Sequence, residues 1–158
     1  MDVTQREAGT GTSRRPDAAM DAGQLQSYLV AEFPQAFGPG RPHEVAGADP
    51  EGVTVRFIAG DEHLRPGATV SGPTMMGLAD IAAYAAILAA IGPVPLAVTT
   101  NFSINFLRRP APGPMLAQAS LLKLGRRLAV CEIALRGEGE DELCAHAVTT
   151  YSIPPRGI

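Results

Sequence analysis

The segment SGPTMMGLADIAAYAAILAAIG, residues 71–92, constrains the fold most strongly, because it is almost entirely apolar and carries a single charge, Asp80. Pro73 suits the first turn of a helix, where its missing N–H leaves no hydrogen bond unmade. Gly92, which is followed by a proline, ends the pattern. The segment therefore predicts one helix over residues 73–91, and a helix that is apolar on nearly every side must be buried.

The uncharged part of this predicted helix is too short to cross a membrane. The run from Ile81 to Ile91 has 11 residues, whereas a membrane-spanning helix needs about 20. Asp80 interrupts the run on one side, and Ser71 or Gly72 is the expected helix cap beyond it. We therefore expect the core helix of a protein that has no membrane partner.

The rest of the chain is divided by 17 glycines and 14 prolines into short alternating runs, which are typical of β-strands. The alternation is strict in residues 98–106, where Val98 and Phe102 share one face, and Thr99 and Asn101 share the other. A short amphipathic helix is predicted before the strands, over residues 24–33. One or two strands are predicted upstream and four downstream, over residues 43–45, 52–59, 98–106, 115–124, 128–136 and 143–153.

Together these elements predict an α+β protein with an antiparallel sheet of five to six strands wrapped around one long central helix. A single helix can be this apolar only if the sheet curls around it. The hotdog fold has this architecture, and the pattern favours it without excluding other arrangements. The 158 residues suggest one domain. We expect it over residues 23–158, after a polar N-terminal tail, residues 1–22, that we expect to be disordered.

Charge and composition exclude several functional classes. The net charge is −3, and the 13 Lys and Arg residues form no basic block, so no nucleic-acid partner is expected. The two cysteines do not indicate a disulfide scaffold, and no apolar run of an export signal follows the arginines at positions 14 and 15. We therefore expect a cytoplasmic protein. The three scattered histidines and the absence of phosphate-binding motifs predict neither a metal nor a cofactor.

Asp80 is the charged residue that needs an explanation, since an unpaired carboxylate in an apolar interior costs several kcal/mol. One explanation is structural: Asp80 is hydrogen-bonded, or it pairs with an arginine such as Arg108 or Arg109. The other is functional: the carboxylate faces a cleft and takes part in catalysis, because perturbed carboxylates cluster at functional sites. The residue pattern alone leaves both explanations open.

Four motifs carry a resemblance to a known family: SGPTMMGLAD, TTNFSINFLRRP, KLGRRLAVCEIAL and AHAVTTYSIP. They resemble the helix and the strands of hotdog-fold acyl-CoA thioesterases of the phenylacetate-degradation (PaaI-like) type, over residues 45–153. The resemblance implies that Asp80 is the catalytic acid, acting as general base or nucleophile, and that the N–H of Gly72 polarises the thioester carbonyl. A helix start offers such unpaired N–H groups.

The spacing of these two residues predicts a dimer. Gly72 and Asp80 are eight residues apart, which is about 12 Å along a helix, too far for one Asp side chain to reach a carbonyl at its own helix start. A two-fold dimer solves this problem, because Gly72 of one protomer can meet Asp80 of the other. We therefore predict a homodimer as the catalytic unit, doubled to a homotetramer.

The sequence departs from the family at two positions. Ser71 stands where the family has His, and its hydroxyl is left to bind a carbonyl or to cap the helix. Pro73 stands where a second Gly is common and removes one N–H donor. Both departures bear on the reaction rate and on the choice of substrate, and they bear less on the fold.

Further residues are candidates for substrate binding. Tyr84 lies one helical turn after Asp80, and Thr99 and Asn101 lie on the polar face of residues 98–106; each residue has a structural alternative. In the family, basic residues near the hairpin turn after residue 124 meet the phosphates of coenzyme A. These are Lys123, Arg126 and Arg127.

The function predicted from these observations is hydrolysis of a medium-chain or aromatic acyl-CoA, with the coenzyme A thioester as substrate. Two alternatives stay open. The first is a hotdog domain that binds an acyl-CoA or acyl ligand without hydrolysing it. Ser71 and Pro73 keep this alternative open, because both depart from the residues of the family. The second is a hotdog dehydratase, whose chemistry usually needs a histidine paired with the acid in the cleft, and none is well placed here.

Overall fold

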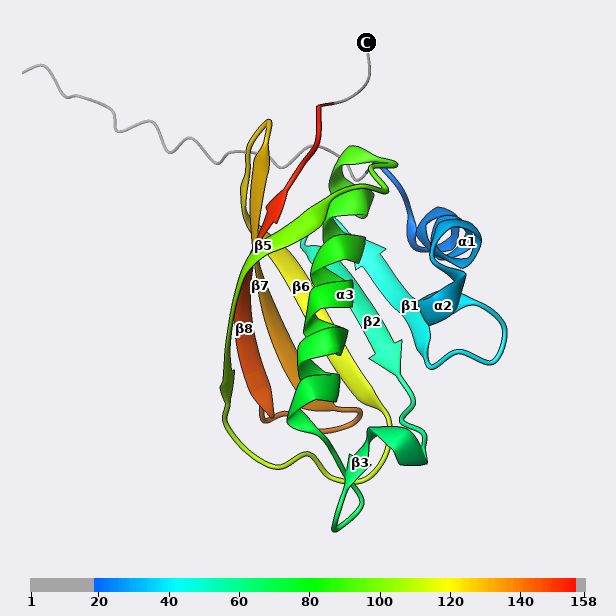
Figure 1. Ribbon diagram of the computed structural model, residues 1–158, viewed down its shortest axis with the longest axis vertical. Helices are drawn as coiled ribbons and strands as arrows, with labels where there is room; N and C mark the ends of the chain where they lie inside the picture. Colours follow the sequence, from blue (N-terminus) through cyan, green and yellow to red (C-terminus); the bar gives the residue numbers. More distant parts are fainter. Residues whose placement is uncertain (1–18, 156–158) are drawn as a thin grey trace, which may run out of the picture.

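The computed structural model describes residues 19–155. In this part of the chain a six-stranded antiparallel sheet curves around one long helix, α3 (Gly72–Ile91) (Figure 1). The strand order is β1-β2-β6-β7-β8-β5, so that β1 and β5 form the edges. The strands are β1 (His43–Asp49), β2 (Gly52–Phe57), β5 (Val98–Phe106), β6 (Met115–Leu124), β7 (Leu128–Gly137) and β8 (Ala145–Ser152).

Helix α3 begins and ends where the cap and stop residues predict. The side chain of Ser71 accepts a hydrogen bond from the N–H of Thr74 at the N-cap, and Gly92 takes a positive φ of 83° at the C-cap, a conformation that favours glycine. The helix is long and apolar enough to cross a membrane by length and composition alone, but 56% of its most apolar window is buried in the fold. It is a core helix, as predicted.

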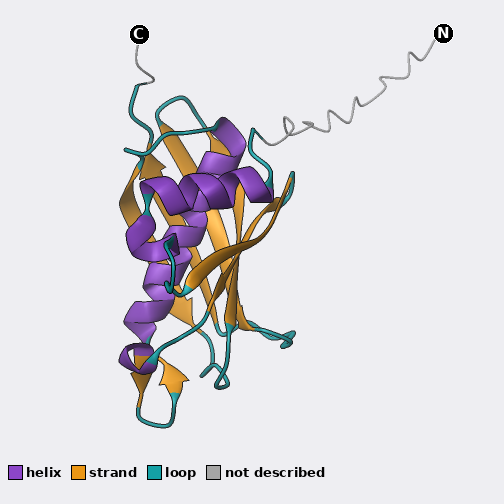
Figure 2. Ribbon diagram, turned by 90° about the vertical axis from the view of Figure 1, so that its right-hand side faces the viewer, coloured by secondary structure: helices purple, strands orange, loops and turns teal. Residues whose placement is uncertain are grey.

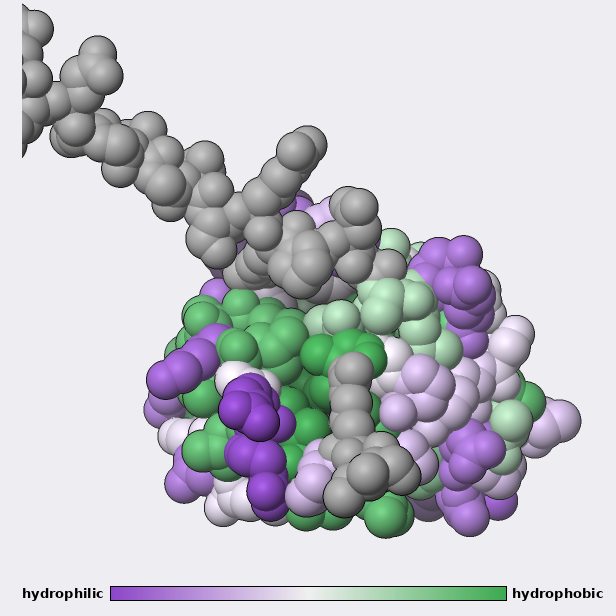
Figure 3. All heavy atoms as spheres, turned by 90° about the horizontal axis from the view of Figure 1, so that it is seen from above, coloured by the Kyte–Doolittle hydropathy of each residue, from purple (hydrophilic) through white to green (hydrophobic). Residues whose placement is uncertain are grey.

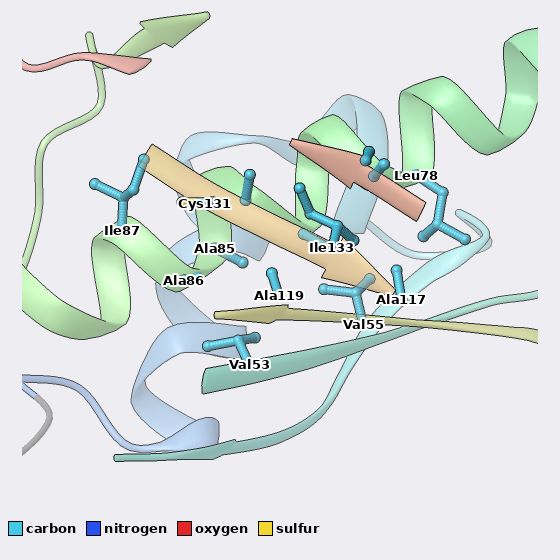
Figure 4. Packing of buried hydrophobic residues seen from close by; sticks show 14 of the residues in the cluster. Val53, Val55, Leu78, Ala85, Ala86, Ile87, Ala117, Ala119, Cys131 and Ile133 are labelled. Carbon is cyan, nitrogen blue, oxygen red and sulfur yellow. The ribbon is translucent and has the colours of Figure 1, made fainter. Parts of the chain in front are cut away.

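The core lies between α3 and the concave face of the sheet (Figure 4). Small side chains let the helix approach the strands closely: Ala85 and Ala86 on α3 lie near Ala119 of β6 and Cys131 of β7. Every second residue of β2 and β7 is buried, which is the period of a strand with one face against a core. The large side chains, such as Ile133, then fill the remaining space between the layers.

Two short helices cover one end of this core beside β1 (Figure 2). Helix α1 (Ala22–Glu32) has a capping box, in which Asp21 and Gln24 exchange hydrogen bonds between side chain and backbone. Helix α2 (Pro34–Phe37) follows after a break at Phe33. The amphipathic helix predicted over residues 24–33 is therefore confirmed in position, with its start two residues earlier.

The predicted tail, residues 1–22, lies outside the described residues except for its last four. Within those four, the N–H of Met20 donates to the carbonyl oxygen of Ala89 at 3.1 Å, and Asp21 caps α1. The ordered domain therefore includes these positions, and the boundary predicted at residue 22 falls inside the helix start.

A small hairpin not predicted from the sequence precedes α3. It consists of β3 (Leu64–Arg65) and β4 (Thr69–Val70), after a 3₁₀ turn over Asp61–His63. The N–H of Ser71 donates to the carbonyl oxygen of His63 at 2.9 Å, which holds the hairpin against the start of α3. Two-residue strands carry too little alternation for a sequence pattern to show them.

Candidate active site

Asp80 lies in the middle of α3, on the side that faces β5 and β8. Its carboxylate Oδ1 accepts two hydrogen bonds, from Thr99 Oγ1 at 2.6 Å and from the Tyr151 hydroxyl at 2.8 Å. The same Tyr151 hydroxyl lies 2.9 Å from the main-chain oxygen of Asp80. The carboxylate is therefore held by two neutral donors from two neighbouring strands.

No cation pairs with Asp80 among the residues that the structure describes. Arg108, one of the partners considered from the sequence, forms its ion pair with Glu142 instead. Arg109, the other, is exposed and forms no ion pair within residues 19–155. An ion pair of Asp80 with Arg108 or Arg109 is therefore not observed among the described residues. The other form of the structural explanation, a hydrogen-bonded Asp80, is observed, with the hydroxyls of Thr99 and Tyr151 as donors.

A β-bulge in β5 brings Thr99 to Asp80. The pairing of β5 with β8 shifts register between Thr99 and Asn101, so Thr99 lies opposite Tyr151 while Asn101 lies opposite Thr150. Beyond the shift, Phe102 packs inward against the core, and Asn101, its neighbour, is exposed on the other face. The strict alternation predicted for residues 98–106 therefore breaks at the bulge, and Thr99 and Asn101 do not share a face.

An open pocket of about 320 Å³ lies beside Asp80. It is bounded by the end of α1, by α3, by the loop that follows α3, and by the first residues of β5. Its lining is mostly apolar and aromatic, and its charged members among the described residues are Asp80 and Glu32. The lining residues are Glu32, Phe33, Asp80, Ile81, Tyr84, Pro95, Ala97, Val98, Thr99 and Tyr151.

Three aromatic rings form one wall of this pocket. Tyr84 stacks on Tyr151, with ring centroids 6.4 Å apart and 24° between the planes. Phe33 meets Tyr84 edge-on, with centroids 6.3 Å apart, an arrangement that aromatic quadrupoles favour. The Tyr84 hydroxyl donates to the carbonyl oxygen of Pro95 at 3.3 Å. The predicted position of Tyr84 beside Asp80 at a pocket is therefore observed, and its role toward a substrate stays a prediction.

Both tyrosines of this wall stay protonated near neutral pH. Burial raises the pKa of Tyr84 above its ordinary value. Burial, followed by the negative charge of Asp80, raises the pKa of Tyr151 further. The Tyr151 hydroxyl therefore acts toward Asp80 as a hydrogen-bond donor, and its ionised form plays no part in the site.

Gly72 is the first residue of α3, at the opposite end of the helix from the loop that lines the pocket. The N–H groups of a first helical turn have no acceptor inside the helix, and the helix dipole places partial positive charge there. A Cβ on Gly72 would lie 3.4 Å from Cζ of Phe106, so the Phe106 ring covers this helix start closely. Ser71 Oγ accepts from the Thr74 N–H at 3.3 Å and lies 2.8 Å from Thr74 Oγ1, which makes Ser71 a helix cap.

One chain does not bring all the candidate residues together. Asp80, Tyr84 and Thr99 meet at the pocket, whereas Ser71 and Gly72 lie about 12 Å away along the same continuous helix. The basic group is separate too, at the turn between β6 and β7, where its three members are exposed. One of them, Arg127, donates from Nε to the carbonyl oxygen of Ile153 at 3.2 Å.

Seven of the ten lining residues were not identified as site residues from the sequence, and the polar or aromatic ones among them are Tyr151, Glu32 and Phe33. Tyr151 is one alternating residue of a strand, and no local motif marks it. Glu32 and Phe33 stand where α1 ends and α2 begins, a break that the sequence shows only through Pro34. No group of three or more His, Cys, Asp or Glu side chains within residues 19–155 is arranged to hold a metal ion.

Seen from above, apolar residues gather on one part of the surface, with hydrophilic residues beside and between them (Figure 3). The loop after α3 exposes Leu96, and the first residue of β5, Val98, is 56% exposed. The other end of β5 also exposes large apolar side chains, Phe106 and Leu107. An edge strand with this much exposed apolar surface is typical of a contact with another chain.

A curved sheet around an apolar helix is the hotdog fold, and its similarity to thioesterases defines the class of this protein as a thioester hydrolase. The sequence profile described as the thioesterase superfamily matches residues 67–144. A crystal structure of a candidate thioesterase from Silicibacter sp. TM1040 is 45% identical, covers 87% of this chain and 94% of its own, and superposes with a TM-score of 0.79. The chain belongs to the thioesterase superfamily.

Two further comparisons concern the fold and the sequence alone. A phenylacetic acid degradation-related protein from Ralstonia eutropha JMP134 shares the fold, with 22% identity over 70% of this chain and 84% of its own, and a TM-score of 0.63. An uncharacterized protein of Mycobacterium tuberculosis is 35% identical over 109 residues, which are 68% of this chain. The match spans 36% of the length of that mycobacterial protein.

Proposed function

We propose that this protein hydrolyses an acyl-CoA thioester and that Asp80 carries the reaction. The observation that supports this most directly is the state of the Asp80 carboxylate. It is held through Oδ1 by two neutral hydroxyls, has no cationic partner among the described residues, and lines an open apolar pocket. A carboxylate kept uncompensated beside a substrate-sized pocket is suited to act as a base or a nucleophile.

In the reaction, the carboxylate has two routes. As general base it takes a proton from a water whose oxygen attacks the thioester carbonyl carbon; as nucleophile it attacks that carbon itself and forms an anhydride that water then opens. In either route the C–S bond breaks, coenzyme A leaves as the thiol, and the negative charge that develops on the carbonyl oxygen needs a donor. We assign this role to the Gly72 N–H at the start of α3.

The donor and the carboxylate meet only if two protomers combine. Within one chain α3 is a continuous helix that holds them apart, so we propose that Gly72 of the partner subunit serves Asp80 of the first. The edge strand β5 carries exposed apolar side chains at both ends, Val98 and Phe106. We propose that β5 forms the interface between the two protomers. A two-fold dimer would contain two such sites, and a tetramer would arise by pairing two dimers.

The pocket lining indicates the acyl group. Phe33, Tyr84 and Ile81 offer apolar and aromatic contacts, which suit a medium-chain or aromatic acyl group. The lining contains two carboxylates and no Lys or Arg among the described residues, so we propose that the acyl group carries no negative charge.

The proposal includes a binding site for coenzyme A and a location in the cytoplasm. The exposed cations near the β6–β7 turn, Lys123, Arg126 and Arg127, suit the phosphates of coenzyme A. Both cysteines, Cys131 and Cys144, are free and buried, which suits the reducing cytoplasm.

The test is thiol release from a panel of short, medium and aromatic acyl-CoAs. We expect turnover by the wild-type protein and a fall in kcat of about 10²- to 10⁴-fold in Asp80→Asn, with the thermal unfolding of that variant showing that it is still folded. Saturable thermal stabilisation by acyl-CoA without turnover in the wild-type protein would instead establish a binding domain.

A further inference from the structure

We propose that Tyr151 is a positioning residue of this site: together with Thr99 it holds Oδ1 of Asp80, so that Oδ2 is the oxygen that reacts. The inference rests on the proposed hydrolytic function and adds to it a residue that lies outside the helix motif. Tyr151 was not among the candidates found in the sequence, because it occupies an ordinary alternating position of β8.

The contact of Tyr151 with Asp80 fixes both the carboxylate and the backbone that carries it. Its hydroxyl lies 2.8 Å from Oδ1 and 2.9 Å from the main-chain oxygen of the same residue. The Tyr151 side chain is 3% exposed and stands on β8, a strand paired on both sides. A buried ring on an interior strand has little freedom, so this donor is preorganised.

Thr99 provides the second donor to the same oxygen. Thr99 and Tyr151 are directly paired across β5 and β8, and the Thr99 hydroxyl reaches Oδ1 at 2.6 Å. Two donors on one oxygen prevent the carboxylate from rotating about its own axis to exchange its oxygens. Thr99 and Tyr151 therefore hold Oδ1 in place and leave Oδ2 as the oxygen that reacts.

The remaining oxygen, Oδ2, is open. It has no hydrogen-bond partner within residues 19–155, and no buried side-chain oxygen in this part of the chain lacks a partner. Oδ2 is therefore not buried, and Asp80 lines the pocket. The other ionisable groups that line the pocket with Asp80 are Glu32 from α1, Tyr84 from α3 and Tyr151 itself, and Cys131 of β7 interacts electrostatically with Tyr151.

The first test is Tyr151→Phe, which keeps the ring and removes the donor. We expect kcat to fall about tenfold, because a hydrogen bond to a charged group is lost, while KM for the acyl-CoA stays within about twofold of the wild-type value.

Two further variants separate positioning from a general packing effect. Tyr28→Phe on α1 removes a hydroxyl that is no part of the pocket, and it should leave kcat and KM unchanged. Thr99→Val removes the other donor to Oδ1, and the double variant should lose less activity than the product of the two single losses, because both act through one oxygen. Strictly multiplicative losses, or a loss in Tyr151→Phe that lies in KM and not in kcat, would overturn the proposal.

A measurement that keeps Tyr151 covers the case in which Tyr151→Phe does not fold. The chain contains three tyrosines, so labelling with ¹³Cζ-tyrosine gives three NMR signals; Tyr28→Phe and Tyr84→Phe assign two of them, and the third belongs to Tyr151. The Tyr151 signal should shift in Asp80→Asn, because the Tyr151 hydroxyl hydrogen-bonds to that carboxylate, and the Tyr28 signal should not respond. A Tyr151 signal that is unchanged in Asp80→Asn rejects the inference, whereas a protein that hydrolyses no acyl-CoA rejects the proposed function instead.

Discussion

Thr99 and Tyr151 face each other across β5 and β8, and both hydroxyls hydrogen-bond to Oδ1 of Asp80, at 2.6 and 2.8 Å. Three elements that are distant in the sequence therefore meet at one oxygen atom. The meeting depends on the bulge in β5, since a regular strand would place either Thr99 or Phe102, but not both, against the core. The edge strand thus carries a site residue as well as exposed apolar surface.

This relationship predicts different results for two neighbouring threonines. Thr99→Val removes a donor to Asp80, and we expect kcat to fall about tenfold. Thr100→Val removes only a hydrogen bond to the carbonyl oxygen of Thr150, and we expect kcat within about twofold of the wild-type value. Steady-state thiol release compares the two variants, and equal losses in both would show that the bulge, and not the Asp80 contact, is what matters.

Most of the fold could be predicted from the sequence because its signals are local. The helix predicted over residues 73–91 is observed as Gly72–Ile91, and the strands β5 and β6 have the predicted bounds. Hydrophobic period, cap residues and Gly-Pro stops act within a few residues of the chain, so they can be read without the tertiary structure. The antiparallel sheet around a central helix is confirmed in the same way.

The site could be predicted only in part. Asp80 was found because a charge inside an apolar helix is a local anomaly. Tyr151 was not found, because its meeting with Asp80 depends on the register of β8 against β5 and on a bulge that no turn residue marks. The wall formed by Glu32 and Phe33 depends on where α1 packs against α3. Such contacts between distant segments leave no pattern in a single strand or helix.

Alanine substitutions at the two glycines of α3, Gly72 and Gly77, test whether the helix start takes part in the reaction. A Cβ on Gly77 would meet nothing within 4 Å, so Gly77→Ala should raise the free energy of unfolding by up to about 1 kcal/mol through helix propensity. A Cβ on Gly72 would lie in van der Waals contact with the Phe106 ring, 3.4 Å from its Cζ, so Gly72→Ala keeps the N–H donor but fills the space beside it, and it should lower kcat/KM. Denaturant unfolding and thiol release check both variants. Full activity in Gly72→Ala would contradict a close approach of the substrate to the Gly72 N–H.

The charge of the pocket predicts a substrate preference. Glu32 and Asp80 both line it, so the wild-type protein should hydrolyse butyryl-CoA in preference to succinyl-CoA, whose acyl chain ends in a carboxylate. Glu32→Gln should reduce this preference by about tenfold through loss of like-charge repulsion. Glu62→Gln, a change at an exposed residue outside the pocket lining, is the control. An unchanged ratio of kcat/KM values in Glu32→Gln would place the acyl group elsewhere.

The buried thiol of Cys131 predicts how stability depends on pH. Burial raises its pKa from an ordinary 9.0 to about 12. Because the folded pKa is the higher one, the contribution of this thiol is complete below pH 9 and is lost as the pH rises from 9 to 12. The free energy of unfolding, measured with urea, should fall between pH 9 and 10 with a slope that is less steep in Cys131→Ala than in the wild-type protein by about 1 kcal/mol per pH unit. An identical slope in the variant would mean that the folded protein lets this thiol ionise.

The proposed exchange of residues between protomers can be tested by complementation. Gly72→Pro removes the N–H donor at a helix position that tolerates proline, and Asp80→Asn removes the carboxylate, so each homodimer should be inactive. After subunit exchange in an equal mixture, half of the dimers are mixed, and each of these contains one site with an intact Gly72 and an intact Asp80. We therefore expect about a quarter of the wild-type activity to return, as two-fold symmetry requires. Size-exclusion chromatography checks that dimers form. If the subunits exchange and the mixture stays inactive, the Gly72 donor and the Asp80 carboxylate do not come from different protomers.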